Sequence, residues 1–248
     1  ELDRLAQALA SARAKFADVF FVPGNHELWL TTDDFEDSLQ KFHAILDLCA
    51  QLDVHTAPAN VGATDGQPGV SVVPLFSWYA KPEEGEDSLF GPKEGEHPSL
   101  DMWMDERVVR WPEALPAATP SAFFLDLNEQ RVARSYDRPV VSFSHFLPRR
   151  DLIFRTPDEI AASPGIPDRH PEFNFSRVAG TRALDRQIRR LGSISHVYGH
   201  QHRNRYRHVD GVLYISHCMG YPGEQGSDES VGAPRVVWEA PTNAAASG

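Results

Sequence analysis

Apolar and polar residues along this chain follow patterns typical of both helices and strands. Apolar side chains recur every three or four positions in residues 2–16 and 34–52, which predicts two amphipathic helices. Continuous apolar runs at residues 18–22 and 70–78 instead predict buried strands. A helix followed by a strand that ends in polar residues is typical of an α/β domain, because open α/β sheets bind ligands at the carboxyl ends of their strands.

The second half of the chain continues this mixture with shorter elements. The patterns predict helices at residues 101–111, 121–136 and 181–191, and strands at residues 140–143, 195–198 and 235–238. Ser121 is the expected N-cap of the second of these helices. A β-hairpin is expected at residues 204–216, because Asp210-Gly211 tolerates the positive φ angles of a two-residue turn. The fold class is therefore α/β, in a layered sandwich.

Other regions lack a regular pattern. Residues 80–138 differ in character from their surroundings and are interpreted as an insertion or lid region, since residues 81–98 combine prolines, glycines and acidic side chains. Residues 148–177 are rich in proline and predict a loop. We expect residues 1–240 to form a single domain and residues 241–248 to be a disordered tail.

Composition narrows the classes of function. A chain of 248 residues with a net charge of −11 is large enough for a substantial core but is not expected to bind nucleic acid in general, which requires a basic surface. It contains no apolar run near the roughly 20 residues that a membrane span requires. Cys49 and Cys218 are expected to be buried free thiols, which favours a reducing compartment and a cytoplasmic location.

Side chains able to bind metal ions follow three of the predicted strands. The motifs are Gly24-Asn25-His26-Glu27, Ser144-His145 and Gly199-His200-Gln201-His202. In an extended chain, residues two apart point the same way, so His200 and His202 could bind one metal ion or two neighbouring ions. Taken singly, Asn25 is equally a turn cap and His145 a surface polar residue. Three such motifs, each at a strand end, favour a metal site.

These motifs resemble the later motifs of the calcineurin-like metallophosphoesterases. The similarity extends from about Leu5 to Tyr221 and includes Phe76-Ser77-Trp78-Tyr79 and Gly220-Tyr221-Pro222. It implies a four-layer α-β-β-α sandwich, with two sheets between helices. It also implies hydrolysis of phosphomonoesters or phosphodiesters, with a phosphorylated small molecule or another phosphoester as substrate.

The roles of individual residues follow from this resemblance. It implies that Asn25, His145 and His200 ligate one divalent metal ion and that His202 ligates a second, the metals being manganese, iron or zinc. It also implies that His26 faces the scissile phosphate and protonates or stabilises the leaving oxygen. The attacking water would be activated by the metal ions, which can lower its pKa from 15.7 to about 7.

Two arginines close to His145 are candidates for substrate binding. Arg149 and Arg150 follow it within five residues, and a guanidinium group can hold a phosphate through two hydrogen bonds. Arginines in such loops are equally often solvated charges. Both interpretations remain open.

The chain departs from the family at its beginning. The earliest family motifs, Asp-x-His and Gly-Asp-x-x-Asp, supply an aspartate and a histidine for one metal ion and an aspartate that bridges both ions. No counterpart precedes Asn25. We therefore expect an N-terminally truncated portion of a longer enzyme, lacking its first strands and part of its dinuclear metal centre. Such a portion should bind one metal ion weakly and have little activity.

Two alternatives to a metallophosphoesterase remain. The same fold also serves as a non-catalytic protein-interaction scaffold with degraded metal sites, and fold alone does not define function. An unrelated mononuclear zinc hydrolase would need a carboxylate near His200, and Asp151 is the nearest candidate. Retention of Asn25, His26 and His145 favours the hydrolase, because a scaffold has no need of such groups.

Overall fold

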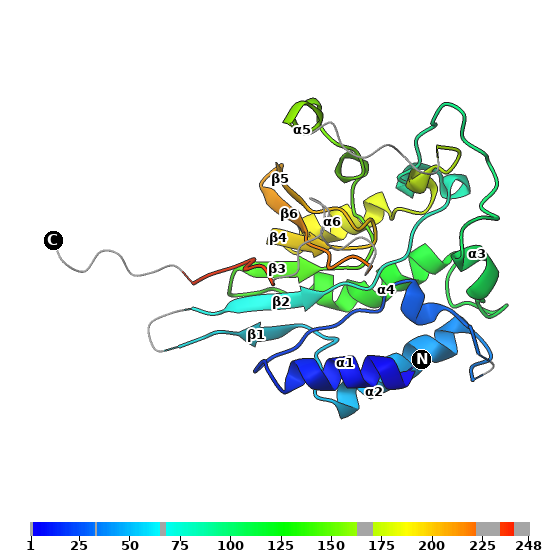
Figure 1. Ribbon diagram of the computed structural model, residues 1–248. Coiled ribbons are helices and arrows are strands. Elements are labelled where there is room, and N and C mark those ends of the chain that lie inside the picture. The colour runs from blue at the N-terminus through cyan, green and yellow to red at the C-terminus, as the bar shows by residue number, and fades with distance from the viewer. Residues whose placement is uncertain (1, 33, 65–67, 163–170, 222–233, 241–248) are drawn as a thin grey trace.

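The computed structural model describes residues 2–32, 34–64, 68–162, 171–221 and 234–240. Within them, one six-stranded sheet forms the centre of the molecule (Figure 1). Its strands are β1 (Ala59–Val61), β2 (Val70–Pro74), β3 (Val140–Phe143), β4 (Ser193–Tyr198), β5 (Arg205–Val209) and β6 (Val212–Ser216). Their spatial order is β1-β2-β3-β4-β6-β5. Strands β2, β3, β4 and β6 run parallel, whereas β1 and β5 are antiparallel edges.

Helices accompany the sheet on several sides. They are α1 (Leu2–Arg13), α2 (Ser38–Gln51), α3 (Asp105–Val108), α4 (Pro120–Val132), α5 (Pro157–Ala162) and α6 (Arg182–Arg190). Short 3₁₀ helices occur at His26–Leu28, Pro82–Asp87, Arg150–Leu152 and Phe175–Arg177. Helices α1 and α2 contact each other and lie beside β1 in Figure 1. The fold is therefore a mixed α/β fold, and the four-layer sandwich stays a prediction.

Two apolar clusters hold these elements together. In the first, Val132 of α4 and Ile188 of α6 pack with sheet residues such as Val140 and Tyr214, so these two helices cover one face of the sheet. In the second, apolar residues of α1 and α2 pack against aromatic side chains of α4 and of the segments that follow β2 and β3. The ends of these two strands are thereby anchored in buried aromatic packing.

Most predicted elements are present, and several of them are shorter than predicted. The hairpin is confirmed: β5 and β6 pair through Val209 and Val212, and both Asp210 and Gly211 have positive φ angles. The expected helices at 2–16, 34–52 and 181–191 correspond to α1, α2 and α6. Among the helices described, none has the length and apolar content that crossing a bilayer would demand.

Other predictions were wrong in detail. Residues 18–22 are extended, but instead of a strand they form one isolated bridge between Phe20 and His55. The helix expected at 101–111 is limited to α3, because the residues that follow it are held by tertiary contacts such as the hydrogen bond from Ser38 N to Arg110 O. Helix α4 begins one residue before Ser121, so its N-cap is Thr119, whose side chain accepts a hydrogen bond from Ala122 N.

Three further expectations need correction or stay open. Residues 235–238 form no strand, and Val236 is largely exposed. The proline-rich segment predicted as a loop contains the short helix α5. Cys49 is a buried free thiol as predicted, whereas Cys218 is only half-buried. The tail at 241–248 lies outside the described residues, and the single-domain boundary stays a prediction.

Candidate functional site

Two neighbouring parallel strands bring two histidines together. Strands β3 and β4 are in register through Phe143 and Val197, so both chains leave the same edge of the sheet. His145 lies two residues beyond β3 and His200 two residues beyond β4. The two loops remain hydrogen bonded, because Gly199 N donates to His145 O over 3.0 Å. The sheet therefore fixes the separation of these side chains.

Asn25 reaches the same point from the N-terminal part of the chain. Its side chain is 2% exposed and makes no capping hydrogen bond to the 3₁₀ helix that follows, so it is not the turn cap considered above. The preceding Gly24 lies directly against the His145 ring. A Cβ atom on Gly24 would lie 2.5 Å from a carbon of that ring, which is shorter than any real contact. Glycine at this position thus permits the close approach.

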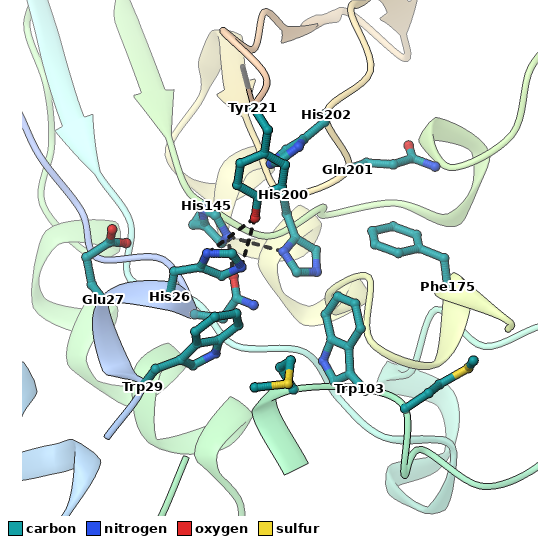
Figure 2. Close-up of a pocket in the computed structure, with 13 residues that line it drawn as sticks. His26, Glu27, Trp29, Trp103, His145, Phe175, His200, Gln201, His202 and Tyr221 are labelled. Atoms are coloured by element: carbon teal, nitrogen blue, oxygen red, sulfur yellow. Dashed lines mark hydrogen bonds between the residues drawn. The ribbon is translucent and has the colours of Figure 1, made fainter. Parts of the chain in front are cut away.

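Three potential ligand atoms converge here. His145 Nε2 lies 3.0 Å from Asn25 Oδ1 and 3.2 Å from His200 Nδ1. His200 Nε2 lies 3.0 Å from Val178 O, which makes Nε2 the protonated nitrogen and leaves Nδ1 as an acceptor. Three acceptor atoms therefore face one another, and a single proton on His145 can satisfy only part of this set. Figure 2 shows the two histidines beside each other at the centre of the cavity.

Both histidines are held in their neutral form. Desolvation lowers the pKa of His145 to about 3, and the positive charges that His26 and His202 can carry act in the same direction. The pKa of His200 lies well below its ordinary value of 6.5, again mainly because of desolvation. Neutral imidazole is the form that binds metal ions. The electrostatics of the site therefore favour metal binding over protonation.

The spacing of these atoms suits a divalent metal ion. Ligand atoms bound at about 2.0–2.1 Å with tetrahedral or octahedral angles lie roughly 2.8–3.4 Å apart. An amide oxygen and two imidazole nitrogens suit borderline metals such as manganese, iron or zinc. In the described part of the chain, no group of three or more His, Cys, Asp or Glu side chains is arranged to hold a metal ion. A three-ligand metal site at this point therefore requires Asn25 in addition to His145 and His200.

His26 lies at the exposed side of the same cavity. Its ring stacks on Trp29 with a centroid distance of 3.8 Å, and the Tyr221 hydroxyl lies 3.3 Å from its Nε2 (Figure 2). Desolvation lowers the pKa of His26, although Glu27 and Asp105 oppose the change. This histidine is thus fixed between two aromatic rings and is mostly neutral at pH 7.

His202 also lines the cavity, but not for the reason expected. The chain beyond β4 is not extended, since His200 and His202 have φ angles of 68° and 53°. Non-glycine residues rarely adopt this left-handed conformation, which costs of order 1–3 kcal/mol and is concentrated at functional sites. His202 contacts the ring of Tyr221 at a centroid distance of 4.8 Å. Side-chain alternation therefore does not account for its position.

The cavity has a volume of about 520 Å³ and is lined both by histidines and by an apolar wall. The apolar wall consists of Met102, Trp103, Met104 and Phe175, and Figure 2 shows Trp103 and Phe175 next to His200. No residue of the expected lid at 81–98 is among the described residues that line the cavity. The segment 102–104, from the same insertion, lines it instead.

Asp105 is the site residue that the sequence motifs missed. Its buried carboxylate accepts a hydrogen bond from Asn25 Nδ2 over 2.9 Å. An acidic residue directly after the apolar run Met102-Trp103-Met104 was the available signal. That signal does not indicate a partner, which lies 80 residues earlier in the chain.

The two candidate arginines lie elsewhere. Arg149 and Arg150 line a second cavity of about 500 Å³, together with Asp151, Arg182 and Asp185. Arg149 Nη2 pairs with Asp151 at 2.7 Å and its Nη1 with Asp185 at 3.1 Å. Asp151 thus belongs to this cavity and not to the surroundings of His200. Contact of either arginine with a substrate stays a prediction.

Comparison with known proteins relates this geometry to a class of enzyme. No protein-family model matches the chain. It is 28% identical, over a 250-residue alignment, to the [acyl-carrier-protein] phosphodiesterase PptH of Mycobacterium tuberculosis. That alignment covers 90% of this chain and 66% of the relative, so the chain spans slightly less than two thirds of the relative's length.

A solved structure agrees with the sequence comparison. The crystal structure of phosphopantetheinyl hydrolase (PptH) from Mycobacterium tuberculosis superposes with a TM-score of 0.62 and 25% sequence identity. The match covers 90% of this chain and 76% of the other. The chain is therefore similar in sequence and in fold to a phosphodiesterase.

Proposed function

We propose that this protein is a metal-dependent phosphodiesterase of the calcineurin-like metallophosphoesterase type. The observation that carries the proposal is the position of His145 Nε2, which lies 3.0 Å from Asn25 Oδ1 and 3.2 Å from His200 Nδ1. Similarity to a phosphodiesterase over 90% of the chain supports the same reaction class. The motifs at residues 24–27, 144–145 and 199–202 support the family.

Asn25, His145 and His200 would hold one divalent metal ion. When bound, such an ion supplies positive charge for a phosphoryl group and lowers the pKa of water. His202 is proposed as a donor to a second ion. With three protein donors that are all neutral, we expect the 248-residue chain to bind one ion weakly.

His26 is proposed to contact the leaving group. Stacking on Trp29 and contact with the Tyr221 hydroxyl hold its ring at the open side of the cavity. A neutral imidazole in this position donates its ring N–H to a developing negative charge on the leaving oxygen. The lowered pKa of His26 keeps that neutral form dominant at pH 7.

The proposed substrate is a phosphodiester with an extended organic group. PptH acts on a phosphodiester of an acyl carrier protein, as its name states. The apolar wall formed by Met102, Trp103 and Phe175 offers a surface for such a group next to the histidines. Inorganic phosphate and compact phosphomonoesters would leave this wall in contact with water.

Calorimetric titration with Mn²⁺ tests the metal site directly. We expect one ion per chain for the wild type, and no measurable binding after His200→Ala. His208→Ala is the matched control, because His208 is exposed on β5 away from the cavity. Equal Mn²⁺ affinity of all three proteins would refute the proposed site.

Hydrolysis separates the enzyme from the scaffold alternative. With Mn²⁺ added, we expect the protein to cleave bis-p-nitrophenyl phosphate and His26→Ala to lose at least about 100-fold in kcat, as is common for a general acid. Reading the coding sequence upstream of residue 1 complements this assay. An Asp-x-His and a Gly-Asp-x-x-Asp there would support the enzyme. A scaffold would show no hydrolysis with Mn²⁺ added, whether or not it binds the ion.

A further inference from the structure

The carboxylate of Asp105 occupies an unusual environment beside the proposed metal site. Asp105 is 2% exposed and begins α3. Its Oδ1 accepts hydrogen bonds from Asn25 Nδ2 and from Trp29 Nε1, at 2.9 and 2.5 Å. Its Oδ2 accepts a hydrogen bond from Trp103 Nε1 at 2.8 Å. A buried carboxylate is thus held by three N–H donors and points at the back of Asn25.

The contact with Asn25 determines which end of its amide faces the histidines. An asparagine side chain has an NH₂ end that only donates and an oxygen end that only accepts. An ionised carboxylate only accepts, so it must meet the NH₂ end. Asn25 Oδ1 is thereby turned toward His145 Nε2, at 3.0 Å. Rotated by 180°, the same amide would present hydrogen atoms to the site and could not bind a cation.

The Asp105 side chain also affects the charge balance of the proposed metal site. Asn25, His145 and His200 are neutral, so a divalent ion bound by them alone would leave two uncompensated positive charges in a low-dielectric region. Asp105 places a negative charge one hydrogen bond beyond Asn25. Outer-shell carboxylates of this type commonly orient metal ligands and raise their basicity.

Trp103 connects this carboxylate to a second member of the set. Its Nε1–H donates to Asp105, and its ring lies edge-on to His200 with a centroid distance of 5.8 Å. The segment 103–105 therefore contacts both Asn25 and His200 from outside. It also contributes Trp103 to the apolar wall of the cavity.

We propose that Asp105 is a positioning residue that orients Asn25 as a metal ligand and offsets the charge of the bound ion. This inference rests on the proposed function, because it assumes that Asn25, His145 and His200 bind a metal ion. A merely structural role is the alternative, in which Asp105 only ties α3 to the turn at residues 25–29. The two roles differ in whether metal affinity changes independently of stability.

Mn²⁺ titration of the 248-residue chain and of Asp105→Asn distinguishes these roles. We expect Asp105→Asn to weaken Mn²⁺ binding by about 10- to 100-fold, as is typical when an outer-shell partner is lost. Glu106→Gln is the matched control. Glu106 is the adjacent carboxylate and contacts Tyr79 and Lys81 instead of Asn25, so its substitution should leave Mn²⁺ affinity unchanged.

A reciprocal exchange provides the rescue. In Asn25→Asp combined with Asp105→Asn, donor and acceptor trade places, and the new carboxylate at position 25 faces the metal site. We expect this double variant to recover at least about tenfold of the lost Mn²⁺ affinity while its melting temperature stays as low as that of Asp105→Asn, because only the pairing with position 25 is restored. If Mn²⁺ affinity and melting temperature both recover, or if neither recovers, the structural role is supported and the proposal is overturned.

The outcomes also separate this inference from the proposed function. If the wild type binds Mn²⁺ and Asp105→Asn binds it equally well, the positioning role is refuted while the metal site stands. If the wild type binds no Mn²⁺, both are refuted. Should Asp105→Asn fail to fold, Trp103→Phe removes the hydrogen bond to Oδ2 and leaves the hydrogen bonds to Asp105 from Asn25 and Trp29. A loss of about threefold in Mn²⁺ affinity then supports the proposal, and unchanged affinity overturns it.

Discussion

Two cavities of this protein are nearly equal in volume and differ in whether their polar groups have partners within the protein. The first, about 520 Å³, gathers three acceptor atoms from Asn25, His145 and His200 that a single proton cannot satisfy. The second, about 500 Å³, contains Arg149 and Arg150. There Arg149 bonds to aspartates that hold the pKa of its guanidinium above the ordinary value.

Charge alone therefore does not indicate a ligand site in this protein. In the second cavity, Arg149 already has carboxylate partners within the protein, and Arg186 pairs with Asp87 at 2.6 Å. In the first, neutral side chains converge in a way that costs free energy unless a cation joins them. The convergence of neutral ligand atoms is therefore the better guide to the function of this chain.

The largest expected effect is the loss of a converging side chain. His145→Ala should weaken Mn²⁺ binding by at least about 100-fold, which corresponds to roughly 2.7 kcal/mol, because the remaining set has only two protein donors. Calorimetric titration measures this change. A similar loss of Mn²⁺ affinity in Arg149→Gln, in the other cavity, would contradict the distinction between the two cavities.

Acid should lower the unfolding free energy mainly through buried histidines, one of which, His145, lies in the first cavity. His145 and the fully buried His196 have folded-state pKa values of about 3, lowered mainly by desolvation from 6.5. Between these values the unfolded chain binds more protons, so stability is highest above pH 6.5. It then falls by about 1.4 kcal/mol per pH unit for each such ring as the pH decreases toward 3.

Urea unfolding of the metal-free chain from pH 7 to pH 4.5 measures this slope. The pKa of Asp151 in the second cavity is lowered from 3.8, mainly by the hydrogen bond from Arg149, so that carboxylate contributes little in this pH range. His196→Gln should reduce the slope by about one proton. An unfolding free energy independent of pH over this range would show that the histidines are not buried as described.

A smaller effect is expected from filling the space beside His145. Gly24→Ala places a Cβ 2.5 Å from the ring, so the ring must move and Mn²⁺ affinity should fall by about tenfold, with a loss of roughly 1–3 kcal/mol in stability. Gly199→Ala is the matched control. Its Cβ would lie 3.5 Å from His145 O, an ordinary contact, and should leave affinity unchanged. Equal effects of the two variants would contradict the close packing of Gly24.

The smallest effect is expected in the second cavity. Arg149→Gln should lower the unfolding free energy by about 1 kcal/mol through loss of a half-buried ion pair and should change Mn²⁺ affinity less than twofold. Chemical unfolding and calorimetry measure the two quantities. If KM for bis-p-nitrophenyl phosphate rose at least fivefold at constant kcat, Arg149 would be a substrate contact after all.

Much of the fold was predictable because its signals are local. Residues adjacent in the chain are enough to indicate the apolar run at β3, the strand before Gly199 and the Asp210-Gly211 hairpin. Helices α2 and α6 follow likewise from their apolar spacing. The positions of His145 and His200 at strand ends were predictable for the same reason.

Local signals failed where distant partners determine the conformation. Residues 18–22 pair with a single residue, His55, and α3 is confined to four residues by contacts that hold the residues after it, such as the hydrogen bond from Ser38 N to Arg110 O. The positive φ angle of His200 is likewise invisible in a pattern of side chains.

Sequence patterns were sufficient to identify the side chains available for chemistry, an amide and a set of imidazoles that each lie next to an apolar run. The tertiary structure places His145 Nε2 next to both Asn25 Oδ1 and His200 Nδ1. It also decided that the carboxylate oriented toward Asn25 is Asp105. The physical reason is that a hydrogen bond between residues far apart in the chain depends on how strands and loops pack, and no local pattern encodes that distance.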